Sequence, residues 1–531
     1  MGSHESSSPA SANLASSVAC LNCRDRHLKC DGNLSGCARC ASLSLPCHFV
    51  PSRRGRKCRP GPYRTTTPPF FLQEDSVSLA AEQAAIGMAP FSPLNSMTQQ
   101  RQQQEAYLAY PPSSARRDRR IHLISLYYLH FHQAHSFLPP MEVFLQSGPP
   151  AYLLDVIEFI SLHYISPFVP DCCGSLQTSV QEAESSVEKV QAFLLLTIVL
   201  HGRQQPDEAK SCLALAIQLS LELGLHRREI SDDMSLQNPV QGECLRRTWW
   251  EIVVVDVLLA AVQLDGVLQF QMTETPDVPL PCEQEEYQQG CIGVQLYTMA
   301  DLERQSLLCN SHFSSFAYRV EAALLLRKCL LAGETHISQE ALDSLSATIT
   351  GWFHRLPKSK RTILQPMGEL DEMMLQAAAL VHCASIYLHF PRSSLLAFLP
   401  ISGRVFCSQP PAFSFTSLDP QMHTAKVAAG AVNISKLASL STAVANHTPF
   451  FTCLLNLSSI LQVALLAEEC LPLSEVNQPY LSLNIGVLLS MGGTWPIAGS
   501  SMQRIREIVM EIQAAAPCSS RQLLDTFPLT S

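Results

Sequence analysis

Six cysteines occupy 28 residues near the N-terminus and follow a repeated spacing. The unit Cys-x2-Cys-x6-Cys occurs twice with six residues between its copies, formed by Cys20, Cys23, Cys30, Cys37, Cys40 and Cys47. Zinc prefers four tetrahedral ligands, so two ions need eight bonds and two of the six sulfurs must bridge. The spacing predicts a closed, structural two-zinc cluster. Because so short a peptide buries little apolar surface, metal binding should supply most of its folding free energy.

Two other interpretations of the cysteines are weaker. A disulfide framework would allow fifteen pairings and needs an oxidising compartment. Residues 1–18 are rich in Ser and Ala without a continuous apolar segment, so no secretory signal is expected. A metallothionein-like metal store would not come with the long apolar remainder of this chain. The zinc cluster is therefore the favoured interpretation.

Basic residues surround the cysteines in two groups. The first group lies between the second and third cysteines and contains Arg24, Arg26, His27 and Lys29. Cations on a short helix can neutralise DNA phosphates, and Arg or Lys can read guanine in the major groove. The second group lies within residues 51–64 and contains Arg53, Arg54, Arg56 and Lys57. Its Gly and Pro residues disfavour a helix, which indicates a DNA-backbone arm, a nuclear import signal or both rather than a plain solvated linker.

The cysteine spacing resembles that of the fungal binuclear zinc-cluster transcription factors. The resemblance implies that Cys20 and Cys37 bridge the two ions. It also implies that the first helix reads a CGG-type triplet, with the first basic group at the family's basic positions. His27 stands where the family usually has Lys or Arg, and the loop between Cys30 and Cys37 lacks the frequent proline. Neutral imidazole has a single donor, so the contact to guanine would differ.

The charge distribution separates a basic head from an acidic body. Residues 1–64 hold 10 Lys and Arg against 3 Asp and Glu, whereas the remainder holds 27 against 43. This asymmetry is typical of a nucleic-acid-binding module joined to a regulatory domain. The expected order starts with a disordered N-terminus (residues 1–17), the cluster domain (18–50) and the basic arm (51–64). A disordered linker (65–116) and two consecutive helical regions (117–290 and 291–531) follow. The linker lacks three consecutive heptads of the kind that form a coiled coil. The sequence therefore allows a homodimer but shows no clear coiled coil that would form it.

The body is predicted to be all-α. Apolar residues recur every three or four positions from Arg119 to Phe131 before Pro139 and Pro140. Further helices are expected over residues 151–165, 190–200, 207–223 and 243–262. A capping box formed by Ser185 and Glu188 should start the 190–200 helix, and Gly202 should end it. Residues 502–515 should form a final amphipathic helix.

The body also resembles the middle homology regulatory domain of the same fungal family over residues 120–285. The matching residues include Arg246-Arg247-x-Trp249-Trp250 and Asp256. Val257 replaces the family's usual Arg, and the usual Gly-Arg-Pro near residue 265 is absent. The resemblance implies a regulatory domain.

Catalytic and membrane functions find little support in the sequence. His130, His132 and His135 have no acidic or cysteine partner nearby in the chain, which favours core or surface histidines over a metal site. Residues 437–467 lack charge but contain many polar side chains, which disfavours a lipid-facing helix. A buried helix pair broken at Pro449 is expected. No phosphate-binding loop or nucleophile motif stands out, so no catalytic residue is assigned.

These features predict a nuclear, zinc-dependent, sequence-specific transcription factor of RNA polymerase II genes that controls a metabolic gene set, such as a biosynthetic cluster. Its cofactors would be two zinc ions per chain. Its partners would be double-stranded DNA, the transcription machinery or a co-regulator, and a small-molecule effector. One alternative is a regulator that acts mainly through protein partners with weakened DNA readout. Another is a helical enzyme with an appended zinc module.

Overall fold

The structure is a computed structural model of the whole chain. It describes residues 23, 29–31, 37–43, 47, 113–166, 168–262, 266–272, 275–293, 296–304, 313–334, 337–365, 368–399, 419–440, 443–469 and 474–515. The chain forms two compact units, Met1–Pro93 and Leu94–Ser531. The predictions for residues 1–17, 51–64 and 65–112 lie outside the described residues.

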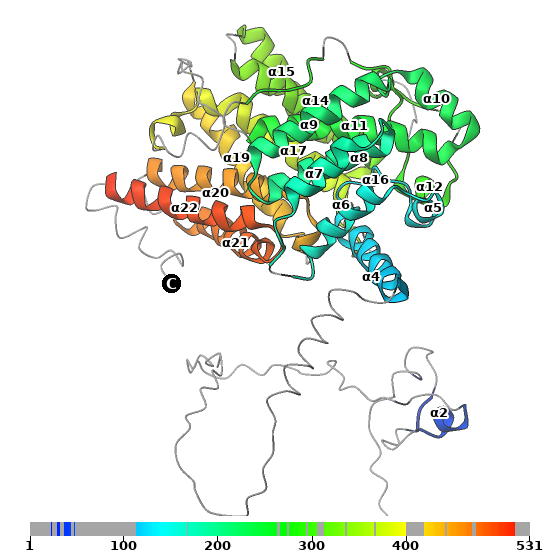
Figure 1. Cartoon of the computed structure of the whole chain (residues 1–531). Coiled ribbons are helices and arrows are strands. Elements are labelled where there is room, and N and C mark those ends of the chain that lie inside the picture. The colour runs from blue at the N-terminus through cyan, green and yellow to red at the C-terminus, as the bar shows by residue number, and fades with distance from the viewer. Residues whose placement is uncertain are drawn as a thin grey trace, which may run out of the picture. The chain divides into compact units, whose positions relative to one another are not determined.

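The body is built from helices throughout its described residues (Figure 1). Its first half contains α4 (Ser113–Leu126), the π-helix η1 (Tyr127–Phe131), α5 (Met141–Gln146), α6 (Ala151–Leu162), α7 (Cys173–Glu182), α8 (Val187–Gly202), α9 (Pro206–Glu222), α10 (Arg228–Gln237), α11 (Pro239–Val262), α12 (Gln284–Gln289) and α13 (Met299–Arg304).

The second half continues with helices of similar length. These are α14 (Ser315–Glu334), α15 (Gln339–Arg355), α16 (Lys358–Arg361), α17 (Glu372–His389), η2 (Phe390–Arg392), η3 (Ser394–Ala397), α19 (Pro420–Ala438), η4 (Val444–Asn446), α20 (Phe450–Glu469), α21 (Ser474–Gly492) and α22 (Pro496–Ala515). Among the described residues no strand forms, and one isolated bridge joins Leu364 to Leu370. The predicted all-α class is confirmed.

Helix boundaries differ from the predictions by a few residues. The cap of α8 is Ser186, whose hydroxyl accepts a hydrogen bond from the Lys189 amide at 3.2 Å. The predicted capping box at Ser185 was therefore one residue too early, because two adjacent serines satisfy the same capping preference. Gly202 ends α8 as expected. Helices α4 and α11 begin six and four residues before the predicted starts at 119 and 243.

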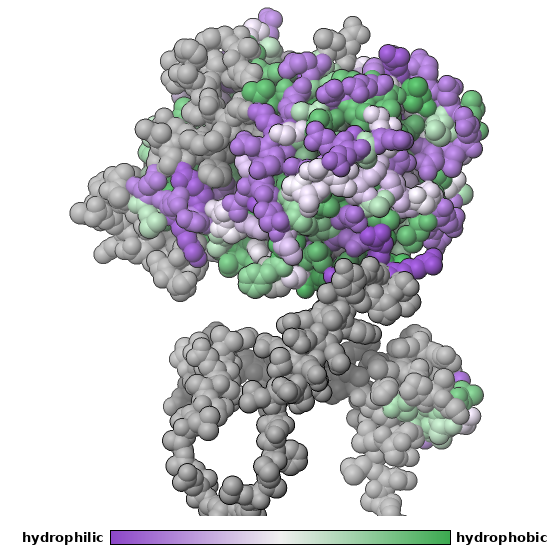
Figure 2. Space-filling model, in the orientation of Figure 1, coloured by the Kyte–Doolittle hydropathy of each residue, from purple (hydrophilic) through white to green (hydrophobic). Residues whose placement is uncertain are grey.

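One continuous apolar core holds the body together. Trp249 and Trp250 are fully buried on α11. Two segments, Glu372–Arg392 and Phe450–Ala467, are long and apolar enough to span a membrane, yet 89% and 83% of their apolar windows are buried inside the body. They are core helices here, and α20 starts directly after Pro449 as the sequence indicated. Polar and apolar residues alternate in patches over the face drawn in Figure 2.

Candidate metal centre

The cysteines that the structure describes lie close enough together to hold metal. The sulfurs of Cys23, Cys37 and Cys40 are all within 4.8 Å of one another, and these three residues are buried. The Sγ atoms of Cys23 and Cys37 are 3.8 Å apart. Two thiolates about 2.3 Å from one tetrahedral zinc ion lie about 3.8 Å apart. The donor set and its spacing therefore fit zinc.

Cys37 belongs to two groups of metal-ligating atoms. The second group contains Cys30, Asp31 and Cys37, again within 4.8 Å. A sulfur shared by both groups is what a bridging ligand requires. Asp31 itself accepts a hydrogen bond from the Ala38 amide at 3.0 Å, at the start of α2 (Ala38–Ser42). Its carboxylate therefore serves the helix terminus, where negative charge is favoured.

Backbone amides stabilise the thiolates of the cluster. The Cys37 amide donates to the Cys47 sulfur at 3.2 Å, and the Cys40 amide donates to the Cys37 sulfur at 3.4 Å. Donors directed at sulfur favour the charged thiolate that binds metal. The short helix α2 positions both amides, because its first turn leaves its N–H groups without intrahelical partners.

Of the predicted DNA-contacting residues, the structure describes Lys29. Lys29 is exposed and directly precedes Cys30. The remaining predicted site residues lie outside the described residues: Cys20, Arg24, Arg26, His27, Arg53, Arg54, Arg56 and Lys57.

A buried polar network, which the sequence did not reveal, crosses the centre of the body. The imidazole of His135 contacts Glu251 on α11 through Nδ1 at 2.7 Å and Thr448 through Nε2 at 2.9 Å. Burial lowers the pKa of His135, so the neutral ring donates to the carboxylate and accepts from the hydroxyl. No acidic residue stands beside these histidines in the chain, and the acidic partner of His135 comes from a distant helix. Its partner is 116 residues away and only folding brings the two together.

The other two histidines also belong to the body's packing. His130 contacts Asn446 through Nδ1 at 2.8 Å and stacks on Tyr164. His132 is buried, and burial lowers its pKa to about 3. His132 packs its ring against Tyr128, so the three side chains contact different partners, as expected for structural histidines.

The two arginines of the Arg-Arg-x-Trp-Trp motif on α11 form buried ion pairs. Glu243 pairs with Arg246 at 3.0 Å and with Arg247 at 2.8 Å. Arg247 also donates to the carbonyl oxygens of Ser136 and Cys282, which ties two loops to α11. A buried arginine with this many acceptors fixes the geometry of its surroundings.

Asp256 has an arginine partner from another helix. Its carboxylate accepts hydrogen bonds from the amides of Gln269 and Phe270 and lies 3.5 Å from Arg327 on α14. The sequence could not show this pairing, since Arg327 is distant in the chain. Burial raises the pKa of Asp256 to about 6 despite these partners.

Two family descriptions match the chain. Residues 18–57 match the fungal Zn(2)-Cys(6) binuclear cluster domain, and residues 94–345 match the fungal specific transcription factor domain. No solved structure matches the chain.

Several fungal transcription factors are similar to this chain in sequence. The C6 finger domain transcription factor iacK of Pestalotiopsis fici is 28% identical across 93% of this chain and 80% of its own length. The transcription factor rglT of Aspergillus fumigatus is 50% identical over 46 residues, 8% of this chain and 11% of its own. The transcription factor MYCFIDRAFT_198930 of Pseudocercospora fijiensis is 40% identical over 67 residues, 12% of this chain and 15% of its own.

The match to the cluster domain and the match to the helical body identify a transcription factor that carries a zinc cluster. The chain belongs to the fungal binuclear zinc-cluster transcription factors, and its cluster domain binds two zinc ions. The predicted family and cofactor are confirmed.

Proposed function

We propose that this protein is a nuclear, sequence-specific DNA-binding regulator of genes transcribed by RNA polymerase II. The observation that carries the proposal is the position of Cys37 in both groups of ligating atoms, which fits a sulfur bridging two zinc ions. In this proposal Cys20 is the second bridge. Cys23, Cys30, Cys40 and Cys47 complete the two tetrahedra. The closed site leaves no position for a catalytic water, so the metal's role is to fold the module.

The DNA contacts follow from the basic residues around the cluster. Arg24, Arg26, His27 and Lys29 would enter the major groove and read a CGG-like triplet, while Arg53, Arg54, Arg56 and Lys57 track phosphates. Lys29 supports this arrangement, because it is exposed beside a cluster cysteine. The acidic helical body would carry the regulatory function through a co-regulator or a small effector. A metabolic gene set, including a biosynthetic cluster, is the proposed target.

The test is selection of the full-length protein on a randomised duplex pool, with zinc and with chelator, at two salt concentrations. We expect zinc-dependent enrichment of one triplet and an affinity that falls steeply with salt, because phosphate contacts release counterions. Salt-sensitive binding without an enriched sequence would overturn sequence-specific readout. That result would favour a regulator that acts through protein partners.

A further inference from the structure

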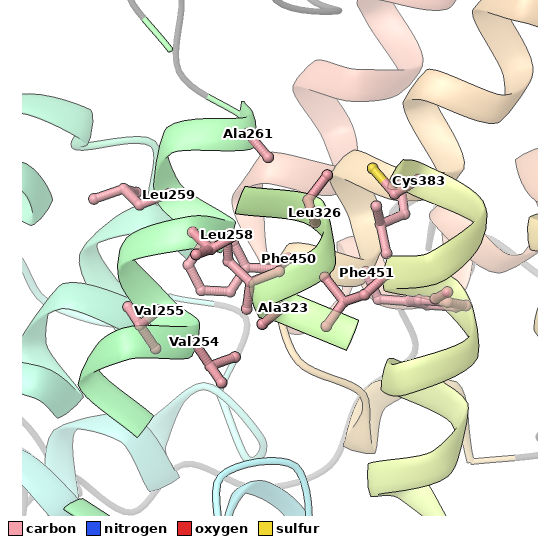
Figure 3. Packing of buried hydrophobic residues seen from close by; sticks show 14 of the residues in the cluster. Val254, Val255, Leu258, Leu259, Ala261, Ala323, Leu326, Cys383, Phe450 and Phe451 are labelled. Atoms are coloured by element: carbon pink, nitrogen blue, oxygen red, sulfur yellow. The ribbon is translucent and has the colours of Figure 1, made fainter. Parts of the chain in front are cut away.

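A largely apolar pocket opens between helices from both halves of the body. Its volume is about 480 Å³, within the roughly 300–1,000 Å³ of small-molecule sites. Leu258 on α11, Leu326 on α14, Leu380 on α17 and Phe450 on α20 form part of its wall. Figure 3 shows Leu258, Leu326 and Phe450 converging from three different helices. The pocket therefore lies where several core helices meet.

One buried polar atom in this wall has no partner. Asn456 on α20 is 3% exposed, and its Oδ1 atom is buried without a hydrogen bond. An unsatisfied buried acceptor costs about 1–3 kcal/mol, so native proteins rarely leave one in place. A donor from a bound molecule would remove that cost. Asn456 Oδ1 is therefore an acceptor that this pocket offers to a bound donor.

A second buried polar side chain of the wall, His201, is uncharged. The His201 ring stacks on Phe450 with centroids 4.2 Å apart, and its Nε2 atom lies 3.4 Å from the Cys453 sulfur. Burial lowers the pKa of His201 to about 3, so the imidazole is neutral at physiological pH. The charged side chains Asp207 and Lys210, on α9, are exposed and half-buried respectively. A charged ligand would lose hydration in such a pocket without gaining a buried counter-ion.

We propose that this pocket binds a neutral, mostly apolar small molecule whose hydroxyl or N–H group donates a hydrogen bond to Asn456 Oδ1. The inference rests on the proposed function, since it assigns the effector of the regulatory body to a specific site. The walls come from residues within the 94–345 domain and from residues beyond it. A bound molecule would therefore stabilise, by mass action, the packing of residues 94–345 against the helices that follow them.

The binding test uses the purified full-length protein and 1-aminoanthracene, a neutral aromatic amine whose fluorescence rises in apolar surroundings. We expect saturable binding of one probe per chain. Two competitors then test the hydrogen bond: 1-naphthol carries a donor, whereas 1-methoxynaphthalene has the same ring system without one. 1-Naphthol should displace the probe at about fivefold to tenfold lower concentration. Equal displacement by both competitors would overturn the assigned role of Asn456.

Variants connect this preference to the pocket. Asn456→Leu should abolish the difference between the two competitors while keeping probe binding. Ala261→Phe should fill the pocket and reduce probe affinity at least tenfold. Ser500→Trp, a change at a half-buried wall position, gives the same test if Ala261→Phe fails to fold. Leu236→Trp, at an 87% exposed residue outside the pocket, is the matched control. Unchanged probe binding in a folded filling variant would overturn the site.

DNA binding is measured separately on the same proteins. Probe binding requires no DNA, so failure of the pocket proposal would leave zinc-dependent DNA selection intact. Failure of DNA selection with a functional pocket would instead overturn the proposed function.

Discussion

Arg319 on α14 and Glu251 on α11 form a bidentate ion pair in which both side chains are fully buried. Arg319 Nη1 lies 2.5 Å from Glu251 Oε2, and Nη2 lies 3.0 Å from Oε1. His135 and Thr448 extend the network to two further segments. Burial opposes ionisation of Glu251, but the charge of Arg319 and the hydrogen bond from His135 outweigh it and lower the pKa of Glu251 to about 2. The pair therefore stays ionised in the centre of the core.

Removing the cation should strongly destabilise the body. Arg319→Met leaves the Glu251 carboxylate buried without its partner, which typically costs about 3–5 kcal/mol. Equilibrium unfolding in denaturant measures the loss. The matched control is Arg304→Met, because Arg304 is 78% exposed and its pair with Asp301 is 3.8 Å long. The control should change the free energy of unfolding by no more than about 0.5 kcal/mol. Equal midpoints for both variants would contradict the assigned role of the pair.

Stability should fall as the pH drops from 6.5 toward 4. Burial lowers the pKa of His201 to about 3 and of His163 to about 4, so the unfolded chain binds more protons below pH 6.5. Each such histidine then costs about 1.4 kcal/mol per pH unit until its folded pKa is reached. Asp256 acts in the opposite direction, because its raised pKa makes stability fall as the pH rises from 3.8 to about 6.

A pair of variants isolates one histidine. His201→Phe should make the dependence of unfolding free energy on pH shallower between 6.5 and 4. His122→Phe, at an exposed position, should leave the slope unchanged. Parallel profiles for His201→Phe and the parent protein would show that His201 is not held neutral by burial.

Zinc content should depend on the bridging cysteines. Cys37→Ala removes a sulfur that both ions would share, so we expect loss of both ions and of DNA binding; Cys20→Ala should act alike. Cys58→Ala, outside the repeated spacing, should keep two ions per chain. Metal analysis of the dialysed proteins measures the ratio. Two retained ions in Cys37→Ala would be incompatible with bridging.

Close packing of α10 against α11 should make any side chain at position 242 destabilising. A Cβ atom at Gly242 would lie 2.8 Å from the Ser231 carbonyl oxygen and 2.8 Å from the Ser235 Cα atom, so backbone must move. Gly242→Ala should cost about 1–3 kcal/mol. Gly351→Ala, within α15 with open space around its Cβ position, should instead stabilise by about 0.5–1 kcal/mol. Thermal unfolding of the two variants should therefore shift in opposite directions.

The residue at position 27 should influence the choice of DNA site. His27→Lys adds an ammonium group where neutral imidazole offers one donor, so affinity for a CGG triplet should rise about tenfold. Titration of labelled duplexes with CGG and with one altered base measures affinity and preference together. Unchanged affinity and preference would remove His27 from the proposed guanine contact.

The cysteine spacing was sufficient to identify the zinc cluster. Each zinc ion needs four tetrahedral ligands, and few spacings of six cysteines allow their sulfurs to bind two ions in this way. Apolar periodicity was sufficient for the all-α class, since it reports which face of each helix is buried. Helix termini were less certain, as the shift of the α8 cap from Ser185 to Ser186 shows. Adjacent residues with equal capping ability leave the boundary to the packing of the whole helix.

Only the tertiary structure determined which buried charges pair. His135, Glu251 and Arg319 are far apart in sequence, and no local pattern relates them. The same holds for the pocket around Asn456, whose walls come from helices in both halves of the body. The sequence by itself determined the metal chemistry and the helical class, because both depend on short-range spacing. The ion pairs and the cavity depend on how distant helices pack, so folding alone decided them.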